Sequence, residues 1–284
     1  MGYAHPEVLV STQWVQDHQD DDNVCILEVD YDPAGAYELG HLRNAALVDW
    51  KKDINDPVRR DILSKHQFEN LMGQVGATPD STLVLYGDMR NWFAAFAFWT
   101  FKIYRHADVR LMDGGRRKWI EEGREVTEDV PKRDQTTYSA GGPDLGLRAF
   151  LPQVLAVLGR DDVGFVDVRS PVEFSGEITA PAEYPTEAAQ RGGHIPGAAN
   201  VPWALAINDD DTFKSADELA ELYLPKGVTP DKSIITYCRI GERSSHSWFV
   251  LKYLLGHPVV INYDGSWSEF GNVVGAPVEK TYAG

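Results

Sequence analysis

The chain has 284 residues, and 43 Asp and Glu residues against 27 Lys and Arg residues give it a formal net charge of −16 at pH 7. A chain this acidic repels nucleic-acid phosphates and anionic membranes, so we expect no nucleic-acid partner and no membrane partner. No apolar run approaches the ~18 residues of a membrane helix, and the first residues lack a secretory-signal pattern, which predicts a cytoplasmic protein. Two cysteines, Cys25 and Cys238, are too few for a disulfide scaffold or a structural zinc site, so we expect no metal.

Strands and helices alternate along the chain. Short β-branched apolar runs predict buried strands, and segments with a helical pattern of residues, which lie between and after these runs, predict helices. The alternation predicts an α/β fold in which mostly parallel sheets carry helices on both faces. The expected strands are 24–29, 83–86, 109–112, 164–168, 234–237 and 259–262, and the expected helices are 91–105, 216–223 and 244–255.

The two halves of the sequence repeat each other. Residues 82–88 align with 233–239 at an offset of 151, and the Asp-Gly pairs at 113 and 264 keep that offset. Matches further upstream have offsets of 153 and 139, so we place an insertion in the second half, at 175–190. A period of about 150 residues indicates duplicated domains. Because the polar stretch 127–146 reads as a linker, the predicted boundaries are 1–126, 127–146 and 147–284.

The residues after the strand 234–237 carry the candidate chemistry. Cys238 follows this strand directly, and a tight loop then leads into a helix. The free amides of such a loop and the helix dipole stabilise an anion, which favours a nucleophilic thiolate. A buried strand-end cysteine is the plainer interpretation, but flanking arginines argue against it. The predicted nucleophile is Cys238, and the predicted substrate-binding residues are Arg243, Arg239, Ile240, Gly241, Glu242 and Ser244.

Three motifs together resemble the rhodanese family of sulfurtransferases, most closely its bacterial two-domain thiosulfate sulfurtransferases. They are Cys-Arg-Ile-Gly-Glu-Arg-Ser at 238–244, Gly-His-Ile-Pro-Gly-Ala-Ala at 193–199, and Tyr-Asp-Gly-Ser-Trp-Ser-Glu-Phe at 263–270. The resemblance implies two tandem rhodanese-like domains, of which the C-terminal one is active. It also implies that Cys238 takes a sulfane sulfur from a small anionic donor as a persulfide and passes it to a thiophilic acceptor, without a metal or organic cofactor.

The identity of the donor depends on the charges around the loop. Many animal rhodaneses carry an arginine that binds the anionic substrate at the position of Glu173, so anchoring falls to Arg243 and then Arg239. Two arginines favour the doubly charged thiosulfate as the donor. Sulfite would then be released, and cyanide would be one acceptor of the sulfur. Two alternatives stay open: 3-mercaptopyruvate as the donor, or a persulfide carrier that serves a protein partner.

Further residues have two interpretations each. Asp167 is either a ligand that orients a loop arginine or a simple turn cap. Trp267 is either a wall of the pocket or a core or interdomain contact. The first half carries Gly87, Asp88 and Trp92 at the positions of the cysteine and the two arginines, which predicts a catalytically inactive domain.

Overall fold

The computed structural model describes residues 2–183 and 188–281, which fall into two compact units. The N-terminal unit comprises Glu7–Asp144 together with Asn208–Phe213, and the C-terminal unit comprises Met1–Pro6, Leu145–Ile207 and Lys214–Gly284. Residues 127–144 of the expected linker thus belong to the N-terminal unit, where the Thr127 amide donates to the carbonyl of His41. The boundaries of the two functional domains stay a prediction.

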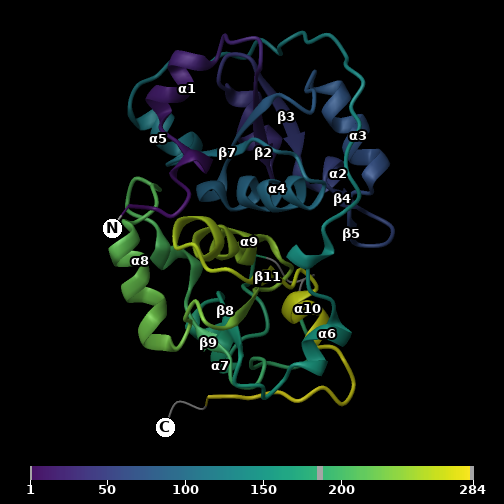
Figure 1. Ribbon diagram of the computed structural model, residues 1–284, viewed down its shortest axis with the longest axis vertical. Coiled ribbons are helices and arrows are strands. Elements are labelled where there is room, and N and C mark those ends of the chain that lie inside the picture. The colour runs from purple at the N-terminus through teal and green to yellow at the C-terminus, as the bar shows by residue number, and fades with distance from the viewer. Residues whose placement is uncertain (1, 184–187, 282–284) are drawn as a thin grey trace. The chain divides into compact units, whose positions relative to one another are not determined.

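The N-terminal unit is built on a five-stranded parallel sheet with the order β1-β7-β6-β2-β3. Every second residue of its central strands joins a core with residues of α1 and α5, and α4 packs against β2, β6 and β7. Helix α4 lies along the sheet (Figure 1). The strands are β1 (Leu9–Val10), β2 (Val24–Asp30), β3 (Ala45–Asp49), β6 (Thr82–Tyr86) and β7 (Val109–Met112), beside an antiparallel pair, β4 (Asn55–Asp56) and β5 (Asp61–Ile62). The helices are α1 (Thr12–His18), α2 (Trp50–Asp53), α3 (Lys65–Gln74), α4 (Trp92–Ile103) and α5 (Gly115–Glu121).

The C-terminal unit repeats this order in a four-stranded parallel sheet, β11-β10-β8-β9. Residues of α6 and α10 join the core on one face, and α9 packs on β10 and β11. The strands are β8 (Val163–Asp167), β9 (Ala199–Asn200), β10 (Ser233–Tyr237) and β11 (Val260–Asn262). The helices are α6 (Leu151–Ala156), α7 (Pro171–Ser175), α8 (Ala216–Tyr223), α9 (Glu242–Phe249), which continues as a π-helix over Val250–Leu254, and α10 (Ser266–Phe270).

Strand pairing confirms the internal repeat residue by residue. Val24 pairs with Thr82 in the first sheet, and Val163 pairs with Ser233 in the second, which reproduces the offsets of 139 and 151. The α/β fold class and the six predicted strands are confirmed, each strand to within one residue at either end. Part of the predicted insertion, 184–187, lies outside the described residues.

Helix length bears on the expected absence of membrane segments. In the ranges that the structure describes, no helix combines the length and the apolar character that a membrane crossing requires. Short 3-10 turns connect many of the elements; they are Pro6–Val8, Pro33–Gly35, Tyr37–Leu39, Met89–Asn91, Leu145–Leu147, Trp203–Ala206 and Leu224–Lys226.

Candidate active site

Cys238 lies immediately after β10, at the carboxyl end of the parallel sheet in the C-terminal unit. Four residues later the chain has entered α9, which begins at Glu242, so the predicted order of strand, tight loop and helix is confirmed. The crevice beyond the carboxyl ends of parallel strands is where α/β proteins bind ligands. The Cys238 side chain is fully buried in this structure.

Gly241 forms the sharp turn that brings the loop back over the sulfur. Its φ of 101° lies in the left-handed region, and a Cβ there would stand 2.6 Å from the Cβ of Asp264, so a larger residue does not fit. The Gly241 amide donates a hydrogen bond to the Cys238 Sγ at 3.1 Å. On its other side, the Gly241 carbonyl accepts hydrogen bonds from the Ser245 hydroxyl at 2.8 Å and the Asn262 amide at 3.2 Å.

A second loop, between β11 and α10, makes hydrogen bonds to the cysteine loop. The Cys238 amide donates to the Ser266 hydroxyl oxygen at 3.1 Å, and the Cys238 carbonyl accepts from the Trp267 amide at 3.1 Å. The Ser268 amide binds the Arg239 carbonyl in the same way. Our sequence reasoning missed Ser266 and Ser268, although both lie in the motif at 263–270, because that motif did not reveal which of its residues contact the cysteine loop.

The environment of Cys238 favours its neutral thiol. Burial is the largest cause, and it raises the pKa of the Cys238 thiol; the carboxylate of Glu242, whose Oε2 lies 3.4 Å from Sγ, raises it further. Arg243 and the backbone amides of Ser244 and Gly241 act in the opposite direction and lower this pKa. The loop thus supplies the predicted thiolate-stabilising groups, but the expectation that they dominate is wrong for this structure, because burial and Glu242 outweigh them.

Both loop arginines lie beside carboxylates. Arg243 donates from Nη1 and Nη2 to the two carboxylate oxygens of Glu173, at 3.1 and 3.2 Å. The Arg239 Nη2 lies 3.8 Å from the Glu242 Oε1, and the Arg243 Nε lies at the same distance from that oxygen. Sequence reasoning noted Glu173 as a departure from the family pattern, and the structure places it directly on the arginine that was expected to bind the donor.

The other predicted substrate-binding residues take different positions in the loop. Ile240 is half-buried. The Ser244 hydroxyl lies within hydrogen-bond distance of the Asn262 side-chain oxygen at 2.6 Å and of the Gly241 carbonyl at 3.0 Å, while the Ser244 backbone amide lowers the pKa of the Cys238 thiol. Whether these residues bind a substrate stays a prediction.

Asp167 and Trp267 meet in a buried cluster with Arg169. The Asp167 carboxylate accepts from the Arg169 Nη2 at 2.6 Å. Of the two interpretations of Asp167, the one in which it orients a loop arginine therefore does not hold in this structure, because its partner is the arginine that follows its own strand. The Arg169 guanidinium lies 4.7 Å from the centre of the Trp267 ring, and all three side chains are fully buried. Trp267 belongs to the hydrophobic core of this unit. Both residues therefore support the fold around the cysteine loop.

The equivalent loop of the N-terminal unit has a different backbone. Three successive residues, Met89, Arg90 and Asn91, have φ values between 47° and 64°, and the Asn91 side chain accepts the Gly87 amide at 3.0 Å. A Cβ at position 87 would run into the Val29 carbonyl oxygen. This loop therefore has no room for a cysteine side chain in its present conformation.

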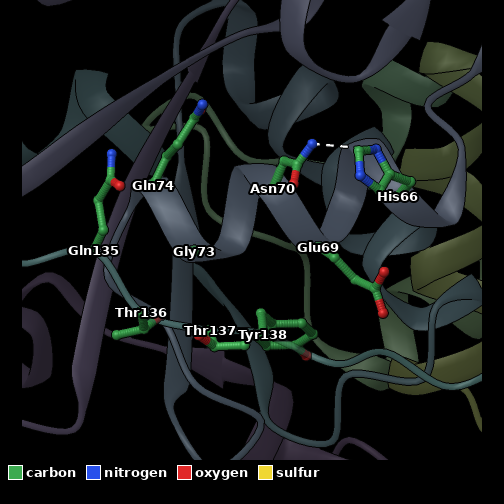
Figure 2. Close-up of a pocket in the computed structure, with 9 residues that line it drawn as sticks. All are labelled: His66, Glu69, Asn70, Gly73, Gln74, Gln135, Thr136, Thr137 and Tyr138. Carbon is green, nitrogen blue, oxygen red and sulfur yellow. Dashed lines mark hydrogen bonds between the residues drawn. The ribbon is translucent and has the colours of Figure 1, made fainter.

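The N-terminal unit also contains a polar cavity of about 390 Å³, between α3 and the segment that follows residue 134 (Figure 2). Its two ionisable groups of note, His66 and Glu69, bind Asn70 and Lys65 respectively. None of the residues that line it carries a thiol or a guanidinium group; they are His66, Glu69, Asn70, Gly73, Gln74, Gln135, Thr136, Thr137 and Tyr138. Within 2–183 and 188–281, His, Cys, Asp and Glu side chains form no group of three or more that could hold a metal ion.

Comparisons with known proteins match this arrangement. The model of the rhodanese-like domain matches twice, over residues 11–122 and 151–272. This chain belongs to the rhodanese family. Among its relatives, the sulfur carrier protein TtuD of Thermus thermophilus is 56% identical, with 99% of each chain covered. A putative thiosulfate sulfurtransferase of Mycolicibacterium smegmatis is 52% identical, over 97% of this chain and 99% of the relative.

Solved structures show the same rhodanese fold. A variant of EanB in complex with ergothioneine superposes with a TM-score of 0.87 at 24% identity, over 99% of this chain and 72% of that one. YnjE superposes with a TM-score of 0.86 at 24% identity, over 99% of this chain and 70% of that one. At this level of identity the likeness establishes the fold, and the two rhodanese domains agree with the tandem arrangement that the repeat predicted. The relatives place the chain among the sulfurtransferases.

Proposed function

We propose that this rhodanese transfers the sulfane sulfur of thiosulfate to cyanide or another thiophilic acceptor through a persulfide on Cys238. The observation that carries the proposal is the position of the sulfur, which lies at the carboxyl end of β10 and accepts the Gly241 amide at 3.1 Å. A backbone amide aimed at a sulfur stabilises negative charge on it and on the atom that it attacks. The names of several relatives support thiosulfate as the donor.

The reaction takes place in two displacements. The Cys238 thiolate attacks the outer sulfur of thiosulfate, the S–S bond breaks, and sulfite leaves with its electron pair. The acceptor then attacks the outer sulfur of the persulfide, and the Cys238 thiolate is restored. This sequence needs no metal or organic cofactor. Because the pKa of the Cys238 thiol is raised, deprotonation of this thiol precedes the first step.

Steady-state formation of thiocyanate from thiosulfate and cyanide tests the proposal. The wild-type chain should turn over many times, whereas Cys238→Ser should be inactive, because a serine hydroxyl is barely ionised near neutral pH and cannot form a persulfide. Cys25→Ser is the matched control, since it removes the other thiol, which lies buried in β2. An active Cys238→Ser variant would refute the proposed role of this cysteine, and a faster reaction with 3-mercaptopyruvate would reassign the donor.

A persulfide carrier is the second candidate function. The observation that favours it is the relative named a sulfur carrier protein, which is 56% identical over nearly the whole chain. A carrier loads one sulfur per chain and delivers it to a protein acceptor, with little turnover on cyanide. Rapid multiple turnover with small molecules would favour the enzyme, and tight stoichiometric binding of a protein acceptor would favour the carrier.

A further inference from the structure

Glu173 is held in one fixed position at the start of α7. Ser170 caps this helix, and its backbone amide donates to the Glu173 Oε2 at 3.0 Å while its hydroxyl donates to the same oxygen at 2.9 Å. Glu173 and Arg243 are 1% and 6% exposed. Arg243 is the chief cause that lowers the pKa of Glu173, to about 2, so the carboxylate stays ionised across the neutral range. The pair is therefore a fixed, buried ion pair.

This ion pair occupies the part of Arg243 that best binds an oxyanion. Each terminal nitrogen donates one hydrogen bond to Glu173, and Nε has no hydrogen-bond partner among the described residues. Arg239, the other cation of the loop, lies beside Glu242. Two guanidinium groups thus face two carboxylates, and with the neutral thiol of Cys238 these five side chains carry no net charge.

We propose that Glu173 is the specificity-determining residue for the sulfur donor, and that it matches the site to donors with one negative charge. The argument rests on the proposed function. In a buried site that is already neutral, each added charge without a partner costs binding free energy. A dianion brings one more such charge than a monoanion. Thiosulfate carries two charges. A thiosulfonate, R–SO2–S⁻, presents the same sulfonyl–sulfur bond with only one, and is the class of donor that this charge balance favours.

The chemistry with a thiosulfonate is the same displacement. The Cys238 thiolate attacks the outer sulfur, the S–S bond breaks, and the sulfinate R–SO2⁻ leaves with the electron pair. Cyanide then removes the outer sulfur of the persulfide as thiocyanate. The two donors therefore differ in two respects. Thiosulfate brings one more negative charge to Glu173 and Arg243, and in a thiosulfonate the group R replaces one oxygen of thiosulfate.

The test compares kcat/KM for thiosulfate and for methanethiosulfonate in the full-length wild-type chain and in Glu173→Gln. Glutamine keeps an oxygen that accepts from Ser170, but it releases Arg243 from its ion pair. We expect the ratio of the two kcat/KM values to move toward thiosulfate by about 10-fold or more, the factor that corresponds to one charge-assisted contact. Glu177→Gln is the matched control, because it removes an exposed carboxylate just after α7 and should leave the ratio unchanged.

A measurement on the wild-type protein covers the case in which Glu173→Gln does not fold. Sulfate and methanesulfonate are unreactive, similar in shape, and differ by one charge, so they are compared as competitive inhibitors of thiocyanate formation. The inference predicts that methanesulfonate binds more tightly, and tighter binding of sulfate would overturn it. An unchanged donor ratio in folded Glu173→Gln would also overturn it and leave the sulfurtransferase function intact. If neither donor loads Cys238, the proposed function itself fails.

Discussion

Glu242 is a charged group in direct contact with the candidate nucleophile, and removal of its charge tests what controls the pKa of the Cys238 thiol. Its Oε2 lies 3.4 Å from the Cys238 Sγ, and its negative charge raises the pKa of that thiol, second only to burial. Glu242→Gln removes the charge but keeps the shape and an oxygen that accepts the S–H. A single charge within ~4–6 Å changes a pKa by about 1–3, so we expect the Cys238 pKa to fall by that amount.

The assay is the rate at which iodoacetamide alkylates Cys238, followed by peptide mapping across the pH range. Because only the thiolate reacts, each decrease of one in the pKa gives about a tenfold faster reaction at a pH below both values. The Cys25 peptide of the same sample serves as the internal reference. Glu221→Gln makes the same chemical change at an exposed position of α8 and should leave the profile where it is. A profile that stays in place or moves to higher pH in Glu242→Gln would refute this reasoning.

Three further predictions follow from the contacts described above. Arg243→Ala should lower kcat/KM for thiosulfate by about 10–100-fold. It should also lower the free energy of unfolding by about 3–5 kcal/mol, because the buried carboxylate of Glu173 loses its partner. Kinetics and urea unfolding that both match the wild type would contradict this. Gly87→Cys, made in a background without the active-site thiol, should form no thiocyanate, because its Cβ meets the Val29 carbonyl; recovery of more than a few per cent of wild-type activity would show that this loop can still form a cradle. Burial raises the pKa of Asp30 to about 8 and that of Glu28 to about 7, so the folded state holds protons that the unfolded state releases, and stability falls as pH rises through this range. The free energy of unfolding of Asp30→Asn, measured relative to that of wild type, should therefore increase between about pH 5 and 8, by up to about 1.4 kcal/mol per pH unit. A difference in urea unfolding that stays flat or falls over this range would contradict the raised pKa of Asp30.

Much of the fold could be predicted from the sequence, because the apolar runs and the repeat are local patterns. The run 24–29 predicted β2, the offset of 139 placed its counterpart β8, and the offset of 151 placed β10 as the counterpart of β6. The short strands β1 and β9 were not predicted, since two residues carry no periodicity. Their positions come from pairing with neighbouring strands, which only the folded chain reveals.

The order of strand, loop and helix around Cys238 was predictable from the sequence, but the electrostatics of this loop were not. The loop around Cys238 is contiguous in sequence, so its cation content could be read directly. The ion pair of Arg243 and Glu173 joins residues 70 positions apart, and no spacing rule connects them. The raised pKa of Cys238 depends on burial, which a count of flanking arginines cannot report. The sequence therefore indicated a site with net positive charge, whereas in the structure the charges of the arginines and the carboxylates cancel.

The most direct test of the central claim is the mass of the Cys238 peptide after the protein is treated with thiosulfate and freed of excess donor. The account predicts one added sulfur, about 32 Da, on the peptide that contains Cys238, and loss of this mass when cyanide is added. The Cys25 peptide should keep its mass. Sulfur found on Cys25 alone, or a Cys238 peptide that never gains mass while thiocyanate is still produced, would contradict a persulfide on Cys238.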